Sequence, residues 1–431
     1  MGENDDVINI ALREPTLWSM VGVSAKLMHI TLSQLLKILL TVAVFILIWC
    51  YRDSSTNSEP TDLIVWWTLS FPGTSEVRHC SSDLQCQVLS TQNPDAEKVG
   101  AYLFYGSNIS FDKLPLPRYP NNILWGLFHE ESPRNVEELM HTEILSLFNF
   151  SSTFSRHSDV PFPLQYLNSL HDITTNEFYI DTSQKSLYLK DIAPVLYLQT
   201  DCETSTQRDI YVKELMKYIN IDSYGRCLNN KQLPNKFKDD YLNNLDESEF
   251  LHFVAKYKFV IAIENGVCTD YVTEKLWRAI KVGSVPIYFG SPKIEDWLPN
   301  KKSALLLKDF PTPKAMSEQI YKLLKNDHLY EQYLEHKTQQ IISNHKLLNE
   351  IKARDYQFDA LKTVEKFECF ICQKLSDKRK GKLHTHIINK SHYDCPKPLS
   401  ALTLSVNVTS SWVYSWDTSN RNIKKLMKTI I

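Results

Sequence analysis

The longest apolar stretch of the chain lies near its N-terminus. Residues 27–51 read LMHITLSQLLKILLTVAVFILIWCY, and Lys37 is the only charged residue among them. A bilayer requires about 20 apolar residues, and a lysine in the outer part of a span can reach the headgroups. Residues 1–26 are too long and too acidic for the start of a cleaved signal peptide. We expect a cytosolic tail at 1–26 and an uncleaved transmembrane signal anchor at 27–51; the alternative is a buried core helix.

Beyond residue 61, short continuous apolar runs alternate with helical or polar stretches, which is typical of an open α/β sheet. This pattern predicts strands at 63–68, 101–105, 122–129, 144–150, 193–199, 258–263, 284–289 and 304–307. Apolar residues at helical spacing predict a helix at 207–220. The pattern loosens at 154–172, so we expect a stem at 52–61, a first α/β domain at 62–190, a second at 191–365, and a cysteine-containing tail at 366–431.

Composition limits the cellular compartments and the classes of binding partner to be considered. The 48 basic and 50 acidic residues give a formal net charge of −2, which excludes the basic footprint of a nucleic-acid-binding protein. Four N-glycosylation sequons follow the apolar stretch, at Asn108, Asn149, Asn389 and Asn407. Eight cysteines also follow it, at Cys80, Cys86, Cys202, Cys227, Cys268, Cys369, Cys372 and Cys395. An even number of cysteines in a lumenal chain favours structural disulfides. Zinc or redox chemistry at the Cys369-x-x-Cys372 pair is the alternative, but no second pair or suitably spaced histidines accompany it.

Residues 258–299 are the most informative segment. The apolar run 259–263 predicts a strand buried on both faces. Thr273 is a plausible helix N-cap, Glu274 and Lys275 fall in the first helical turn, and Gly283 follows the helix. Ligands of open α/β sheets bind where strand ends meet helix N-termini, and these termini favour phosphate. We therefore expect Glu274 and Lys275 to face a ligand; the alternative is a solvated first turn.

A second candidate segment comes earlier, at Glu130 and Glu131. Both residues follow an apolar strand and precede Ser132-Pro133, which fits the start of a helix. Adjacent strand residues alternate faces, so one carboxylate is expected to face the cleft and the other to face solvent. The inward carboxylate could serve as a general base. The alternative is two exposed acids that stabilise the helix dipole.

These segments together resemble the α1,3-fucosyltransferases, glycosyltransferase family 10. The resemblance is carried by Glu264-Asn265, Asp270-Tyr271-x-Thr273-Glu274-Lys275 and Gly283-x-Val285-Pro286. It extends to Glu131-Ser132-Pro133, to the loop 154–159 and to Arg208 with Tyr211 and Leu215, and so spans about residues 62–372. The runs at 128–133, 222–227 and 367–372 look most like the fucosyltransferase 10/11 branch, whose members are linked to O-fucosylation of protein domains in the endoplasmic reticulum.

The resemblance implies a GT-B fold, in which two Rossmann-like domains face a cleft and the second binds GDP-fucose. It implies that Glu131 is the general base and that Arg208 and Lys275 neutralise the diphosphate. It assigns the ribose to Glu274 and other donor contacts to Glu264, Asn265, Tyr271, Thr200 and Asp201. It places Arg156, His157 and Asp159 in a loop near the acceptor; the alternative is that Arg156 and Asp159 pair to brace the crossing between domains.

The resemblance also implies two disulfides, Cys80–Cys369 and Cys86–Cys372. Two further bridges among Cys202, Cys227, Cys268 and Cys395 stay unassigned. No cofactor and no metal are expected, because fixed cations can neutralise the departing diphosphate. The competing interpretation takes Asp201-Cys202-Glu203 as the acidic pair of a manganese-dependent transferase.

The predicted function is inverting, metal-independent transfer of fucose from GDP-fucose to glycoprotein glycans, in α1,3 linkage to GlcNAc. The expected location is the Golgi membrane, as a single-pass type II protein with a lumenal catalytic body. One alternative is O-fucosylation of serine or threonine in folded domains, with the endoplasmic reticulum as the location. The other is a catalytically silent lumenal binding relative. Glu131, Arg208, Glu274 and Lys275 occur together, which favours an active enzyme.

Overall fold

The computed structural model describes residues 41–44, 62–69, 71–73, 75–95, 97–118, 122–132, 136–237 and 245–430. The chain forms two compact units, 1–60 and 61–431. The predicted tail, anchor and stem lie outside the described residues except for Thr41–Val44, which are helical. Among the described residues, no helix has both the length and the apolar character needed to cross a membrane. The fold below is that of the unit 61–431.

The first half of this unit forms a six-stranded mixed sheet with the order β2-β3-β1-β4-β5-β6. Its strands are β1 (Asp62–Trp66), β2 (Glu76–Ser81), β3 (Leu84–Ser90), β4 (Val99–Tyr105), β5 (Leu124–His129) and β6 (Phe150–Thr153). Only β2 and β3 pair antiparallel. The predicted strands at β1, β4 and β5 are confirmed. The β2–β3 hairpin was not predicted, because β2 is mostly exposed and lacks an apolar run.

The strand predicted at 144–150 is wrong. Residues Thr142–Leu145 form the short helix α2, and β6 begins only at Phe150. Ile144, Leu145, Leu147 and Phe148 are all buried, so the segment is mostly apolar, with Ser146 exposed between them. Such a segment cannot by itself distinguish a buried helical turn from a buried strand.

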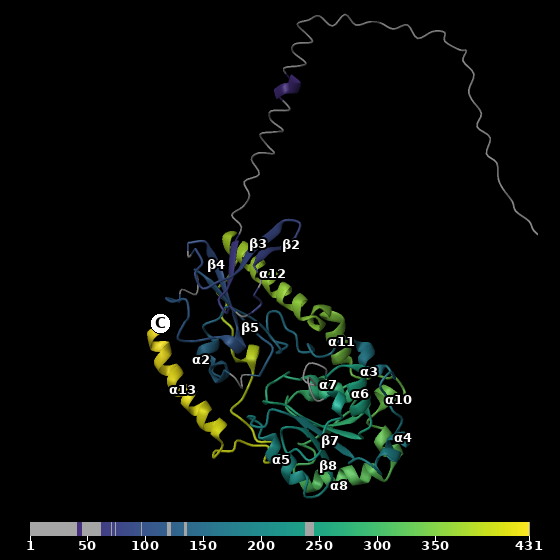
Figure 1. Ribbon diagram of the computed structural model, residues 1–431. Helices are drawn as coiled ribbons and strands as arrows, with labels where there is room; N and C mark the ends of the chain where they lie inside the picture. Colours follow the sequence, from purple (N-terminus) through teal and green to yellow (C-terminus); the bar gives the residue numbers. More distant parts are fainter. Residues whose placement is uncertain are drawn as a thin grey trace, which may run out of the picture. The chain divides into compact units, whose positions relative to one another are not determined.

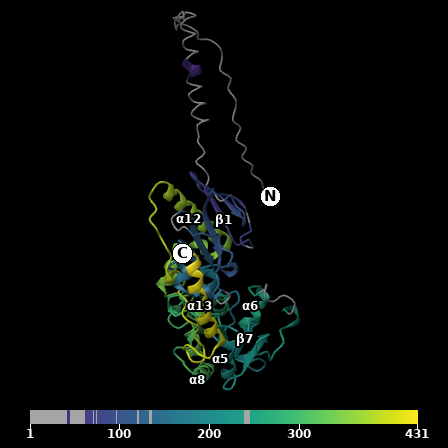
Figure 2. The same ribbon diagram turned by 90° about the vertical axis from the view of Figure 1, so that its left-hand side faces the viewer.

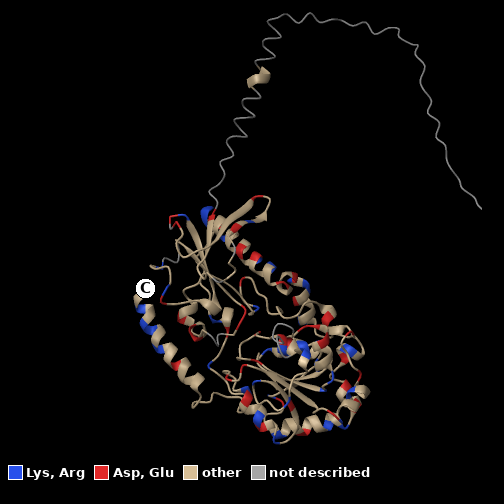
Figure 3. Ribbon diagram, in the orientation of Figure 1, with Lys and Arg blue, Asp and Glu red and all other residues tan. Residues whose placement is uncertain are grey.

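The second half forms a five-stranded parallel sheet with the order β11-β10-β9-β7-β8 (Figure 1). Its strands are β7 (Val195–Gln199), β8 (Ile221–Gly225), β9 (Phe259–Ile263), β10 (Val285–Phe289) and β11 (Leu305–Leu306). Strands β7, β9 and β10 contain no charged residue, whereas both signs are interspersed on the helices around them (Figure 3). Strand β8 was not predicted, because Asp222 and Ser223 interrupt its apolar pattern.

Helices cover both faces of the second sheet. The odd-numbered residues of β7 and β9 pack toward α5 (Arg208–Leu215) and α8 (Pro313–Leu324), and the even-numbered ones toward α6 (Ser248–Ala255) and α7 (Glu274–Lys281). Shorter helices complete this half and its crossing from the first half: α3 (Leu170–Thr174), α4 (Thr182–Tyr188), α9 (Asp327–Glu331), α10 (Glu335–Thr338) and α11 (His345–Ala353). Single 3₁₀ turns lie at 106–108, 137–140, 235–237, 294–296, 355–358 and 390–393.

The chain then returns to the first sheet. Helix α12 (Ala360–Arg379) packs on one face of that sheet, beside β1 in Figure 2, and α13 (Ser411–Ile430) packs with α2 on the other. Both carboxylate oxygens of the buried Glu368 accept hydrogen bonds, from Trp66 Nε1 at 2.8 Å and from Arg78 Nε at 2.7 Å. The boundary predicted at 365/366 therefore falls inside α12, and the predicted tail is packed on the body.

Four disulfides join the eight cysteines. The predicted pairs Cys80–Cys369 and Cys86–Cys372 are confirmed, and they fasten α12 to β2 and β3. The four cysteines whose pairing was not predicted form the disulfides Cys202–Cys227 and Cys268–Cys395. Zinc binding at Cys369 and Cys372 is thereby excluded for this fold, because both sulfurs are used.

One of the four sequons is incompatible with a glycan. Asn149 is 2% exposed, and its Oδ1 accepts hydrogen bonds from Trp125 N at 2.9 Å and from Arg118 Nη2 at 2.6 Å. The predicted modification of Asn149 is therefore wrong for this fold, because the amide is part of the core. Asn108 and Asn389 are exposed and Asn407 is half-buried.

The close approach of α12 to the first sheet gives a testable expectation at Gly126. A Cβ at this residue would lie 2.7 Å from Leu103 Cδ2 and 2.8 Å from Phe367 Cζ. Gly126→Ala should therefore lower the free energy of unfolding by about 1–3 kcal/mol through overpacking. Gly100→Ala is the control, since its Cβ would meet only the flexible end of Leu375. Urea unfolding without reductant measures both, and a larger loss for Gly100→Ala would contradict the docking described.

Candidate active site

The end of β9 and the start of α7 are joined by Glu264. Its Oε1 accepts a hydrogen bond from Thr273 N at 2.8 Å, and its Oε2 accepts one from Thr273 Oγ1 at 2.7 Å. Thr273 is the N-cap of α7, as predicted. Burial raises the pKa of Glu264 to about 7, although the nearby Lys275 acts in the opposite direction. Glu264 therefore fixes the helix start rather than presenting its carboxylate to the cleft.

Glu274 and Lys275 form a charged pair at the N-terminus of α7. Lys275 Nζ donates to Glu274 Oε1 at 3.1 Å and to Thr273 Oγ1 at 3.2 Å. Burial alone would raise the pKa of Glu274, but Lys275 and Arg278 lower it to about 2. The Lys275 side chain is only 10% exposed, so the alternative of a solvated first turn is wrong. A cation and a helix N-terminus thus meet at one point, which favours an anionic ligand.

Arg208 is fully buried at the start of α5. Its Nη1 donates to Asn265 Oδ1 at 2.7 Å, and its Nη2 donates to the Asp201 carbonyl at 2.6 Å. The structure therefore brings together Arg208, Asn265 and Asp201, three of the residues that the resemblance assigns to the donor. Thr200 contributes its carbonyl to Arg226 Nε, 3.1 Å away.

The manganese interpretation of Asp201-Cys202-Glu203 gains no support from this geometry. Among the described residues, one group of three potential metal ligands gathers, namely Cys202, Asp209 and Cys227. Cys202 and Cys227 are joined in a disulfide, so neither can supply a thiolate. Only the Asp209 carboxylate is left as a ligand in that group.

Glu131 lies one residue beyond Glu130 at the end of β5, and its carboxylate faces the second domain. Tyr271 Oη donates to Glu131 Oε2 at 2.8 Å. Glu130 instead accepts from Tyr105 Oη, and burial raises its pKa. One of the two acids faces the other domain, as predicted, but Glu130 does not face solvent, because the end of the sheet continues as packed structure.

Tyr166 is a site residue that the sequence analysis missed. Its Oη donates to Glu131 Oε1 at 3.4 Å. Burial, followed by the negative charges of Glu131 and Glu274, raises the pKa of Tyr166 well above its usual value. Tyr166 therefore lies between the carboxylate of the first domain and the charged pair of the second. It belongs to the loose stretch 154–172, which offered no motif that could have identified it.

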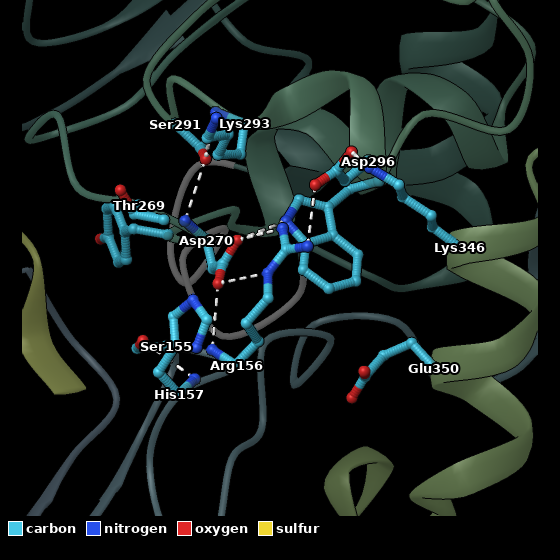
Figure 4. Close-up of polar contacts among 12 residues, drawn as sticks. Ser155, Arg156, His157, Thr269, Asp270, Ser291, Lys293, Asp296, Lys346 and Glu350 are labelled. Carbon is cyan, nitrogen blue, oxygen red and sulfur yellow. Dashed lines mark hydrogen bonds and ion pairs between the residues drawn. The ribbon is translucent and has the colours of Figure 1, made fainter. Parts of the chain in front are cut away.

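Arg156 connects the two domains (Figure 4). Its Nε donates to Asp270 Oδ2 at 2.8 Å, and its Nη2 donates to Asp270 Oδ1 at 2.5 Å. Its Nη1 donates to Asp296 Oδ2 at 2.8 Å, and its guanidinium lies 4.4 Å from the Trp297 ring centre. The alternative of an Arg156–Asp159 pair is wrong, because Arg156 contacts Asp270 and Asp296 of the second domain instead.

The rest of the loop 154–159 also makes structural contacts. Asp159 accepts a hydrogen bond from Ser151 N at 2.9 Å and lies beside His392 and His386. His157 N donates to Ser155 Oγ at 3.2 Å. These contacts account for Arg156, His157 and Asp159 as parts of the framework around the cleft.

Taken together, one domain contributes a carboxylate, that of Glu131, and the other contributes two largely buried cations, Arg208 and Lys275. Glu131 can accept a proton, while Arg208 and Lys275 can stabilise negative charge that develops opposite it. This arrangement suits transfer of a group from a diphosphate donor to a hydroxyl.

Comparison with known proteins finds matches along both halves of the body. The family model "Fucosyltransferase, N-terminal" matches residues 59–165, and "Glycosyltransferase family 10 (fucosyltransferase) C-term" matches residues 190–390. The chain is 41% identical over 384 residues to "Alpha-(1,3)-fucosyltransferase B" of Drosophila melanogaster, covering 84% of this chain and 82% of the relative. It is 36% identical over 396 residues to human "GDP-fucose protein O-fucosyltransferase 3", covering 87% of this chain and 80% of the relative. A relative of the same name in Xenopus laevis is 37% identical over 377 residues, covering 84% and 80%.

Among solved structures, a match is "Crystal Structure of alpha1,3-Fucosyltransferase with GDP". It has a TM-score of 0.40 and 17% identity, and the match covers 69% of this chain and 91% of that one.

The Arg156 contacts predict a large stability effect. Arg156→Ala should lower the free energy of unfolding by about 3 kcal/mol, because it leaves the fully buried Asp270 carboxylate without its cation. The control is Lys217→Ala, which breaks an exposed pair with Glu214 and should cost about 0.5 kcal/mol or less. Equal losses for the two variants in urea unfolding would show that the Arg156 contact is not an important connection.

Proposed function

We propose that this chain, which belongs to glycosyltransferase family 10 and is a fucosyltransferase that uses GDP-fucose, transfers fucose to serine or threonine hydroxyls of folded protein domains. The name shared by the human and Xenopus relatives supports this acceptor, since each match covers at least 84% of the present chain. The resemblance of its motifs to the fucosyltransferase 10/11 branch points the same way. We further propose the GT-B arrangement, with the donor held by the second domain.

Transfer to GlcNAc in α1,3 linkage is the second candidate. The name of the Drosophila relative, at 41% identity, favours it. It is also the acceptor predicted from the sequence. The donor side of the site is common to both candidates, so the distinction depends on the acceptor.

The observation that carries the proposed transfer chemistry, which is common to both candidates, is the position of Glu131, whose carboxylate faces Tyr271 of the second domain. In the proposed reaction, Glu131 takes the proton of the acceptor hydroxyl as its oxygen attacks the anomeric carbon of fucose. The new carbon–oxygen bond forms as the bond to the GDP oxygen breaks on the opposite face, so the configuration inverts. The electron pair of the broken bond stays with GDP.

The departing GDP accumulates negative charge, which Arg208 and Lys275 are placed to meet. The N-terminus of α7 adds the partial positive charge of its backbone N–H groups. Two fixed cations and a helix end can supply the stabilisation that other transferases obtain from a metal, so we propose metal-independent chemistry. Glu274 is proposed to bind the ribose, and Asn265 holds Arg208 in place.

We also propose that residues 27–51 anchor the chain in a membrane of the secretory pathway, with the body in the lumen. The four disulfides suit an oxidising compartment. Transfer to folded domains favours the endoplasmic reticulum, whereas transfer to glycans favours the Golgi.

The acceptor proposal is tested with the full-length chain, radiolabelled GDP-fucose and excess chelator. Acceptors are N-acetyllactosamine glycans and a set of small folded disulfide-rich domains, each also supplied reduced and unfolded. Label on folded domains alone is the expected result. Label on lactosamine alone would establish the second candidate, and loss of all transfer in chelator would overturn metal independence.

The assignment of Glu131 predicts that Glu131→Gln lowers turnover by at least about 100-fold, the usual contribution of a general base. Calorimetric titration with GDP should give unchanged affinity, because Glu131 belongs to the first domain. Glu130→Gln is the matched control and should keep most of its activity, since Glu130 is occupied by Tyr105. Loss of GDP affinity in Glu131→Gln, or greater loss of turnover in Glu130→Gln, would mean that the base has been misplaced.

A further inference from the structure

The backbone of Glu131 is held by a residue far away in the sequence. Tyr393 Oη donates to the Glu131 carbonyl oxygen at 2.8 Å and lies 2.6 Å from His129 Nδ1. Tyr393 is 1% exposed, and its ring stacks on His129 with ring centres 5.5 Å apart. It lies beyond residue 390, where the matched family segment ends.

The directions of these hydrogen bonds follow from the chemistry of the groups. A carbonyl oxygen only accepts, so Tyr393 spends its single hydroxyl proton on Glu131. It must then accept from His129, which places the imidazole proton on Nδ1. His129 Nε2 is left as an acceptor for Ser107 Oγ, 3.0 Å away. The result is a one-way chain of donors from Ser107 through His129 and Tyr393 to the backbone of Glu131.

This series of hydrogen bonds requires that the imidazole of His129 is neutral and that there is room for its ring. Burial lowers the pKa of His129 to about 3, so the ring stays neutral at physiological pH. A Cβ at Gly106 would lie 2.3 Å from His129 Cγ, so only glycine at that position accommodates the ring. The glycine at position 106 thus leaves the space that the His129 ring needs to take part in the hydrogen-bond series.

The residues around Tyr393 are fixed to both domains. On one side, Ser155 Oγ donates to the Ser391 carbonyl and Thr153 Oγ1 donates to the His392 carbonyl, both at 2.7 Å. On the other side, Thr269 N donates to the Asp394 carbonyl at 2.8 Å, and Cys395 is bonded to Cys268. Tyr393 therefore lies where the segment passes from the acceptor-side domain to the donor-side domain.

From these contacts we infer that Tyr393 is a positioning residue for the reaction, which sets the orientation of Glu131 through its backbone carbonyl. The inference rests on the proposed role of Glu131 as the base. Tyr393 is buried, and it holds the peptide from which the reacting carboxylate extends. A carboxylate that is displaced by even about 1 Å loses much of its catalytic effect.

The test uses the full-length chain and Tyr393→Phe, which keeps the ring and removes the hydroxyl. Turnover is followed as GDP released from GDP-fucose, with the acceptor that the wild-type chain labels and also with water as acceptor. We expect kcat to fall about 10-fold, the rate equivalent of one lost buried hydrogen bond. The KM for GDP-fucose and the affinity for GDP should stay within about twofold of wild type, because no donor contact changes.

Tyr330→Phe is the matched control. Tyr330 is also fully buried and donates to a carbonyl, that of Lys258, at 2.7 Å, but it lies within the second domain away from Glu131. It should lose stability like Tyr393→Phe while keeping its kcat. An equal loss of kcat in both variants would show that the loss comes from general destabilisation, and it would overturn the inference.

A double-mutant cycle supplies a measurement that a purely structural role would not affect. Glu131→Asp withdraws the carboxylate by one methylene, so Tyr393→Phe added to it should cost less than about twofold. The same 10-fold loss in both backgrounds, or a wild-type kcat in Tyr393→Phe, would overturn the positioning role. Full activity of Glu131→Gln would instead contradict the proposed function, which keeps the two failures distinguishable.

Discussion

Four consecutive residues, 268–271, carry the connection on which the cleft depends. Cys268 forms a disulfide with Cys395, and Asp270 forms an ion pair with Arg156. Thr269 and Tyr271 donate hydrogen bonds to Asp394 and Glu131. Asp270 has a φ of 69°, a left-handed conformation that turns successive side chains toward different partners. A reaction centre divided between two domains works only if their separation is held within a fraction of an ångström. A disulfide, an ion pair and two hydrogen bonds fix it here.

The two arginines at the domain boundary differ in the charge that surrounds them. Arg156 forms ion pairs with two carboxylates, those of Asp270 and Asp296, which neutralise its charge within the framework. Arg208 is held mainly by neutral acceptors, the Asn265 amide and two carbonyls, with the Asp201 carboxylate oxygen 3.8 Å away. A buried cation that is held by dipoles keeps much of its field for a second anion. The same side-chain type therefore connects the two domains in one place and, in the proposed reaction, stabilises an anionic ligand in the other.

The features that could be predicted from the sequence are those that depend on the local order of apolar and polar residues. The parallel strands around 259–263, the N-cap at Thr273 and the inward position of one acid of the pair Glu130 and Glu131 follow from apolar runs and residue spacing. The choice of Glu131 followed from family resemblance. The two disulfides that reach α12 followed from family resemblance. What the sequence could not predict is which distant residue completes a contact: Arg156 with Asp270, or Tyr393 with Glu131. Those pairings are separated by 114 and 262 positions, and they depend on how the domains come together rather than on any periodicity.

The disulfides of α12 also govern the order in which the molecule can be completed during synthesis. Cys80 and Cys86 await partners that lie 289 and 286 residues further along the chain. At roughly 5–20 residues per second, their thiols remain unpaired for about 15–60 s while the second domain emerges and folds. The first sheet, although made first, can therefore be joined to α12 only after the second domain has been made. Any thiol-handling chaperone has that interval in which to act on the two unpaired cysteines.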